Sequence, residues 1–234
     1  MELPASLRNH QKTMDLITAV REDIVAYFAD TQELCFNERD LQMHLALWLR
    51  GSIHNYDDVD VEYYVPYQLL GQDYIWRNEL RLDLMVRKAD AYLPIELKYK
   101  TKRIRKCISR FGRIIPESID IMKSQGAQDI GMYSFWKDVR RLELLHRHFE
   151  RVVGGVALFV TNDRSYLNQT RESSNNCKLS MAQGIRSREK SWRNSESYCA
   201  KNYPAFSVDR DYDLQWHSIN VEDVELYYNI TTIR

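Results

Sequence analysis

Asp83, Glu96 and Lys98, near the middle of the chain, are two acids and an amine whose spacing could let them share a proton or hold a metal ion. Glu96 and Lys98 stand two positions apart, so they share one face of a strand, and Glu96-Leu97-Lys98 is the only acid-x-lysine triplet in the sequence. A turn centred between Ala89 and Asp90 places Asp83, on the preceding run, directly opposite Glu96. Two carboxylates held that close need a shared proton or a cation between them.

An earlier helix offers a further carboxylate. Glu38 stands three residues before Leu41 and seven before Leu45, so it tops the apolar stripe of that helix, with Gln42 beside it. Three carboxylates and backbone carbonyls are oxygen ligands of the kind that Mg²⁺ or Mn²⁺ takes. An acid in a first helical turn is also favourable by about 0.3–1 kcal/mol through the helix dipole, which explains Glu38 without any site.

A run of positive charge begins at Lys98. It contains eight Lys and Arg residues and no acid as far as Arg113. Such a run can hold phosphate groups, although a solvated face is the plainer alternative; its start at Lys98 favours binding. The members beyond Lys98 are Lys100, Lys102, Arg103, Arg105, Lys106, Arg110 and Arg113. We expect a second basic stretch, between Lys178 and Arg193, to be a solvated surface.

Hydrophobic spacing predicts the elements that must position these residues. Helical periodicity predicts helices over 12–29, 37–50 and 128–150, with Asn37 as the N-cap of the second and Gly51 ending it. Alternation predicts strands over 59–65, 82–86 and 93–98, and the apolar run 152–160 is typical of a strand buried on both faces. A polar excursion with a short helix at 182–190 and two closing strands, 214–219 and 224–233, complete the pattern.

Composition limits the class of protein. The chain has 234 residues, 44% of them hydrophobic and 28% charged, which fits one soluble α/β domain over 1–234 with a central mixed sheet flanked by helices. The longest apolar run, 152–160, is too short for a bilayer, so we expect a cytoplasmic protein with no membrane partner. Equal numbers of acids and bases argue against a uniformly basic coat, and no Cys-x-x-Cys signals a zinc cluster.

Glu38 on an early helix, Asp83 on one strand and Glu96-Leu97-Lys98 on the next resemble the PD-(D/E)XK nuclease superfamily, which includes restriction endonucleases and Holliday-junction resolvases. The order of elements resembles that restriction-endonuclease-like core over about 35–161. The polar excursion, about 162–204, and the C-terminal strands, about 205–234, follow it as additions. The chain departs from the pattern at Leu82, where the family often has proline.

The resemblance implies a metal-dependent nuclease that hydrolyses phosphodiester bonds, with DNA favoured over RNA and a homodimer favoured if both strands are cut. Asp83 and Glu96, with the Leu97 carbonyl, would hold Mg²⁺ or Mn²⁺, and Lys98 would assist the attacking water. Glu38 would be an accessory catalytic and metal-binding carboxylate. The auxiliary polar residues would be Gln42, Asp138 and Arg141, although an ion pair within one helix also explains the last two. The alternative is a non-catalytic module that binds nucleic acid or protein with the same fold.

Overall fold

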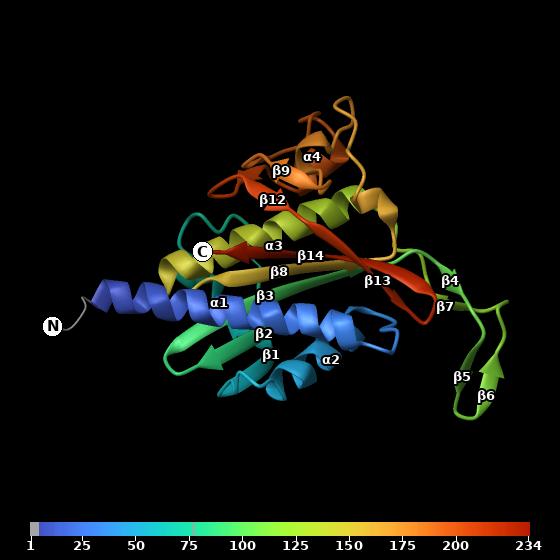
Figure 1. Ribbon diagram of the computed structural model, residues 1–234. Helices are drawn as coiled ribbons and strands as arrows, with labels where there is room; N and C mark the ends of the chain where they lie inside the picture. The colour runs from blue at the N-terminus through green and yellow to red at the C-terminus, as the bar shows by residue number, and fades with distance from the viewer. Residues whose placement is uncertain (1–4, 77) are drawn as a thin grey trace.

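The computed structural model describes residues 5–76 and 78–234, with side chains from Leu16 onward, and is built on one mixed sheet (Figure 1). Its six strands lie in the order β1-β2-β3-β8-β14-β13. Neighbours β3 and β8 are parallel and the other neighbouring pairs are antiparallel. The strands are β1 (Asp58–Val65), β2 (Leu80–Lys88), β3 (Ala91–Lys100), β8 (Gly155–Thr161), β13 (Trp216–Val221) and β14 (Val224–Ile233). The predicted α/β class with a central mixed sheet is confirmed.

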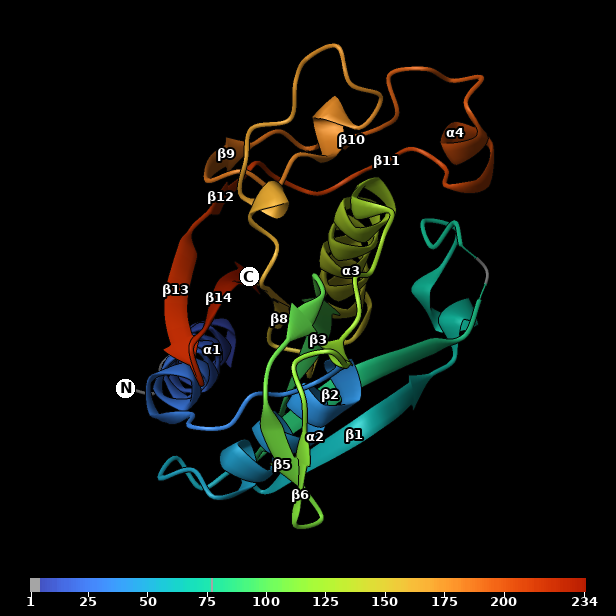
Figure 2. The same ribbon diagram turned by 90° about the vertical axis from the view of Figure 1, so that its right-hand side faces the viewer.

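Helices cover both faces of this sheet. The first two helices, α1 (Ala5–Asp30) and α2 (Glu38–Arg50), lie on one face, and α3 (Gln128–His148) lies on the other (Figures 1 and 2). Alternate residues of the buried strand β8 therefore enter different cores: Leu158 packs with α1 and α2, whereas Phe159 packs with α3. No helix within residues 5–76 and 78–234 has the length and apolar character needed to cross a bilayer.

The second helix begins and ends where the sequence predicts. The Asn37 side chain accepts a hydrogen bond from the Asp40 N–H, and the Gly51 N–H donates to the Leu47 carbonyl. These contacts satisfy backbone groups that a helix leaves free at its ends. The start of α2 is thus fixed locally, and Glu38 becomes its first residue.

The polar excursion folds over the outer side of α3, as both ribbon views show. Leu179, Met181 and Trp192 from this segment are buried in the core that α3 shares with the sheet. The predicted helix at 182–190 is wrong, because Gly184 adopts a φ of 96° that a helix does not accept. The segment instead forms short elements: η2 (Arg164–Tyr166), η3 (Cys177–Leu179), β9 (Gly184–Arg186), β10 (Glu189–Lys190), α4 (Tyr198–Asn202), β11 (Phe206–Ser207) and β12 (Tyr212–Leu214).

An arm after β3 is the feature that hydrophobic spacing did not predict. It leaves the end of β3, extends from the body and returns to α3 (Figures 1 and 2). Two small two-stranded ribbons build it: β4 (Ile104–Arg105) with β7 (Asp120–Met122), and β5 (Ile108–Arg110) with β6 (Arg113–Ile115). Most of the basic run is therefore carried on this arm.

The face of strand β2 on which alternate side chains lie changes in its middle, at Asp83. Leu84 belongs to the core beneath α1 and α2, yet Leu82, which simple alternation places on the same face, belongs to the core beneath α3. The pairing with β1 skips this point, where Glu62 has a φ of 54°. This change of face decides which groups the Asp83 side chain contacts in the candidate site.

Candidate active site

The edge of β3 that faces β2 becomes free where the two strands separate. Their ladder has the predicted register, from Lys88 opposite Ala91 to Leu84 opposite Ile95, and ends one pair before Asp83 and Glu96. Beyond that point the backbone N–H groups of β3 need other acceptors. The Leu97 N–H donates to Asp83 Oδ2 at 2.6 Å, and the Tyr99 N–H donates to Glu38 Oε2 at 2.8 Å.

Gln42, on α2, forms hydrogen bonds with both β1 and β2 near this point. Its Nε2 donates to the Asp83 carbonyl at 2.7 Å and to Glu62 Oε1 at 3.4 Å. The amide therefore satisfies a backbone carbonyl at the point where the β1–β2 ladder is broken. The contacts of Gln42 hold the strand that carries Asp83, and its auxiliary role at a site stays a prediction.

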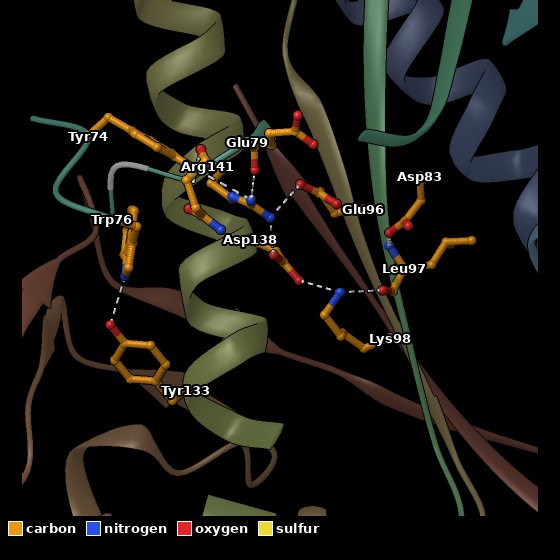
Figure 3. Close-up of polar contacts among 11 residues, drawn as sticks. Tyr74, Trp76, Glu79, Asp83, Glu96, Leu97, Lys98, Tyr133, Asp138 and Arg141 are labelled. Atoms are coloured by element: carbon orange, nitrogen blue, oxygen red, sulfur yellow. Dashed lines mark hydrogen bonds and ion pairs between the residues drawn. The ribbon is translucent and has the colours of Figure 1, made fainter. Parts of the chain in front are cut away.

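Lys98 lies between β3 and α3 (Figure 3). Its Nζ is 2.9 Å from Asp138 Oδ2 and donates to the Leu97 carbonyl at 2.8 Å. The amine thus occupies the carbonyl oxygen that the resemblance assigns to a metal. Burial lowers the pKa of Lys98, but the Asp138 carboxylate and its acidic neighbours outweigh burial and raise that pKa above its ordinary value.

Arg141, on α3, contacts the Glu96 carboxylate on β3. Its Nη1 lies 3.4 Å from Glu96 Oε1 and 3.2 Å from Asp138 Oδ1, and Glu96 itself is buried. The intrahelical ion pair of Asp138 and Arg141 therefore forms, and each partner also reaches across to β3 (Figure 3). Asp138 and Arg141, the predicted auxiliary residues, therefore contact the candidate residues of β3 as well as each other.

A loop between β1 and β2 supports Arg141 from the other side. The Nη2 group donates to the Tyr74 hydroxyl and to the Glu79 carbonyl, both at 3.4 Å. On the same loop, Trp76 Nε1 donates to the Tyr133 hydroxyl of α3 at 2.8 Å (Figure 3). The sequence analysis did not select Tyr74 or Trp76. The signal that could have identified them is the concentration of aromatic residues in this loop, around η1 (Tyr67–Leu70).

Carboxylates are crowded together in this cluster. Those of Glu38, Asp83, Glu96 and Asp138 act on one another, Lys98 and Arg141 contact them, and Lys137 acts on Glu96 and Asp138 from nearby. Burial raises the pKa of Asp83 to about 6, which Lys98 and the Leu97 N–H only partly counteract. Burial and the Asp138 carboxylate raise the pKa of Glu96 well above its usual range.

The cluster fits a divalent cation in its chemistry. The donors are oxygens, as Mg²⁺ and Mn²⁺ require, and a divalent cation would relieve the repulsion that raises the pKa values of Asp83 and Glu96. The expected convergence of three carboxylates is not formed, however: within the described residues no three Asp, Glu, His or Cys side chains gather closely enough to form a metal site. The reason lies in β3, whose free N–H groups hold the Asp83 and Glu38 carboxylates apart.

The basic run divides into paired and unpaired members. Acidic side chains lie within ion-pair distance of five of its eight residues: Lys98 contacts Asp138, Lys102 contacts Asp163, Arg103 and Arg105 contact Asp120, and Lys106 contacts Glu222. The pairs of Arg103 and Arg105 with Asp120 are partly exposed, so they contribute little stability and can exchange for other anions, whereas Asp163 is buried. Among the described residues no carboxylate pairs with Lys100, Arg110 or Arg113, so these three are the freest for phosphate contacts.

The second basic stretch is not simply a solvated surface. Lys178 is exposed and lies 2.5 Å from Glu189, as a surface residue should. Lys190, in contrast, is 1% exposed, and its Nζ lies 3.2 Å from the centre of the Trp136 ring. The expectation of a solvated face is wrong for Lys190, because the excursion folds back on α3 and buries it.

Comparisons with known proteins add no relative. No family model, curated protein or solved structure matches this chain. The site therefore has to be interpreted from its own geometry.

A stability measurement can test the electrostatics of Asp83. Because folding raises the pKa of this acid from 3.8 to about 6, the folded state binds more protons in that window, and stability falls as the pH rises through it. At about 1.4 kcal/mol per pKa unit, Asp83→Asn should be more stable than wild type by up to about 3 kcal/mol at pH 8 in EDTA, and equal to it near pH 4. Urea unfolding at the two pH values measures this. Asp90→Asn, in the exposed β2–β3 turn, is the control and should show no such pH dependence; identical pH profiles for Asp83→Asn and wild type would contradict the site's electrostatics.

Proposed function

We propose that this chain is a metal-dependent nuclease with a restriction-endonuclease-like core, hydrolysing phosphodiester bonds of nucleic acid, DNA in preference to RNA. One observation supports the proposal: Asp83, Glu96 and Lys98 lie near the point where β2 and β3 separate, and burial and neighbouring carboxylates raise the pKa values of Asp83 and Glu96 there. Carboxylates crowded in this way repel one another and need a shared proton or a cation between them. A divalent cation would relieve that repulsion at neutral pH.

In this proposal Asp83, Glu96 and the Leu97 carbonyl would hold Mg²⁺ or Mn²⁺. A divalent cation so placed supplies Lewis-acid polarisation of the scissile phosphate and lowers the pKa of a bound water. Binding would require Lys98 to leave the Leu97 carbonyl, which its Nζ now occupies. Asp138 would keep the displaced amine nearby, since the two groups are 2.9 Å apart.

Lys98 enters this chemistry as a cation. Its raised pKa makes it a poor proton acceptor at neutral pH, so we assign it no role as a general base. A protonated amine can instead donate a hydrogen bond to the attacking water and neutralise the charge that develops on the phosphate. Arg141 and Asp138 position Lys98 and Glu96 from α3, and Glu38 holds the edge of β3 through the Tyr99 N–H.

The second candidate function is a non-catalytic module that binds nucleic acid. The position of Lys98 favours it, because an amine on the Leu97 carbonyl partly neutralises the cluster without any metal. Such a module would bind nucleic acid through the basic arm and would not hydrolyse it. The two functions differ in their response to a divalent cation.

We expect wild-type protein to cut DNA with Mg²⁺ or Mn²⁺ and to leave it intact in EDTA. The same cations should stabilise the fold in proportion to RT ln(1 + [L]/Kd), about 2.7 kcal/mol at a hundred times Kd. Gel assays on plasmid, linear duplex, single-stranded DNA and RNA, with calorimetry in parallel, measure both effects. Asp83→Asn should lose both responses while Asp90→Asn keeps them. DNA binding without cleavage and without stabilisation by metal would favour the binding module.

A further inference from the structure

The tip of the arm has a side chain that neither packing nor backbone preference explains. Arg110 pairs with Arg113, so Phe111 and Gly112 alone form the turn between β5 and β6. Both have positive φ, 54° and 73°, as a type I′ turn requires. Such turns favour Asn-Gly, because the left-handed region is costly for a bulky side chain. Phe111 is nevertheless there, and it is fully exposed.

The surroundings of this ring are cationic. Arg110 and Arg113 flank the turn, and no acid occurs between Lys98 and Pro116. Within the part of the chain that the structure describes, neither arginine pairs with a carboxylate. An exposed ring between two guanidinium groups matches a stacked base flanked by phosphates, because the ring can stack on a base and each arginine can pair with a phosphate.

The arm is also anchored beside the candidate active site. The Arg110 guanidinium lies 4.6 Å from the centre of the Phe36 ring, and Phe36 stands two residues before Glu38. At the base of the arm, Lys106 donates to the Glu222 carbonyl in the β13–β14 turn. Two contacts with the body therefore fix the direction of the ribbon, which projects beyond the sheet in both ribbon views.

We propose that Phe111 is a wedge that inserts between stacked base pairs of duplex DNA, with Arg110 and Arg113 on the phosphates that flank the opened step. A two-stranded ribbon is narrow enough to enter a DNA groove. Apolar side chains inserted at a base step unstack and bend the duplex, and arginines beside them supply affinity. The wedge deepens the proposed nuclease function and rests on its choice of DNA, but it requires no cleavage.

Base stacking can be followed directly with duplex DNA containing 2-aminopurine, whose fluorescence rises when it is unstacked. In EDTA, wild-type protein should raise the signal of duplexes carrying the probe at the opened step. Phe111→Asn should abolish the rise and weaken binding about fivefold to a hundredfold, as expected for the loss of one stacked aromatic side chain. Asparagine suits a type I′ turn, so this variant should melt no lower than wild type, which separates loss of the ring from misfolding.

Two further variants complete the test. Phe111→Trp should restore the fluorescence rise, and Ile53→Ala, which removes an 87% exposed apolar side chain outside the arm, should behave as wild type. A wild-type complex with no fluorescence change at any probe position would overturn the wedge. So would a Phe111→Asn protein that unstacks DNA normally but changes its oligomeric state in sedimentation, which would assign the tip to a second copy of the chain. A fluorescence rise without cleavage in Mg²⁺ would keep the wedge and reject the nuclease.

Discussion

Lys98→Met should reduce cleavage at saturating substrate by about a hundredfold to a thousandfold, the usual loss when one charged or hydrogen-bonding group no longer stabilises a transition state. The amine contacts both the Leu97 carbonyl and the Asp138 carboxylate. Its loss removes a donor to the reacting groups and leaves the phosphate contacts of the arm unchanged. The defect should therefore appear in kcat, with DNA affinity close to that of wild type.

Lys100→Met is the matched control for this variant, since Lys100 follows two residues later on the same strand and shares its face. It should raise the apparent KM and flatten the dependence of log K on log salt by about 0.9, with kcat preserved. Lys98→Met removes one of the two cations that pair with Asp138 in the described part of the chain, so a melting curve must show that the variant is folded at the assay temperature. Turnover by Lys98→Met equal to that of wild type would exclude the proposed role.

Lys190→Met should stabilise the protein most strongly below pH 7. Burial, and then the positive charge of Arg186, lower the pKa of Lys190 from 10.5 to about 7. The folded state therefore binds fewer protons between these values, so wild-type stability falls as the pH decreases through this window and the cost is complete below it. No hydrogen-bond partner of Nζ occurs among the described residues.

The size of the effect follows from the two opposing contributions. A pKa lowered by this amount costs on the order of 5 kcal/mol, and the Trp136 ring face returns about 2 kcal/mol to the ammonium form. We therefore expect Lys190→Met to gain about 3 kcal/mol at pH 6, with the gain vanishing near pH 10.5. Urea unfolding across that range measures it, and Lys178→Met, at an exposed lysine, should differ from wild type by less than about 0.5 kcal/mol. A Lys190→Met protein that is less stable at pH 6 would show that the amine has a partner in solution.

The sequence by itself determined the elements and the pairing that depends on neighbours. Asn37 caps α2 through the N–H three residues later, so the position of Glu38 follows from local hydrogen bonding. The register of β2 and β3 follows from the short turn at Ala89, because a two-residue turn leaves one way to pair the strands. Asp83, Glu96 and Lys98 could be chosen as one group for the same reason.

Only the tertiary structure decided which partners these side chains have. The change of face in β2 directs the Asp83 side chain to the Leu97 N–H. It depends on the hydrophobic cores on both faces of the sheet. The contacts of Asp138 and Arg141 with β3 depend on how α3 lies across the sheet, some 40 residues along the chain, which hydrophobic spacing does not specify. Burial of Lys190 likewise requires the excursion to fold back on α3. Periodicity encodes which side of an element meets apolar neighbours, whereas the pairing of charges depends on how finished elements pack, and packing is a property of the whole fold.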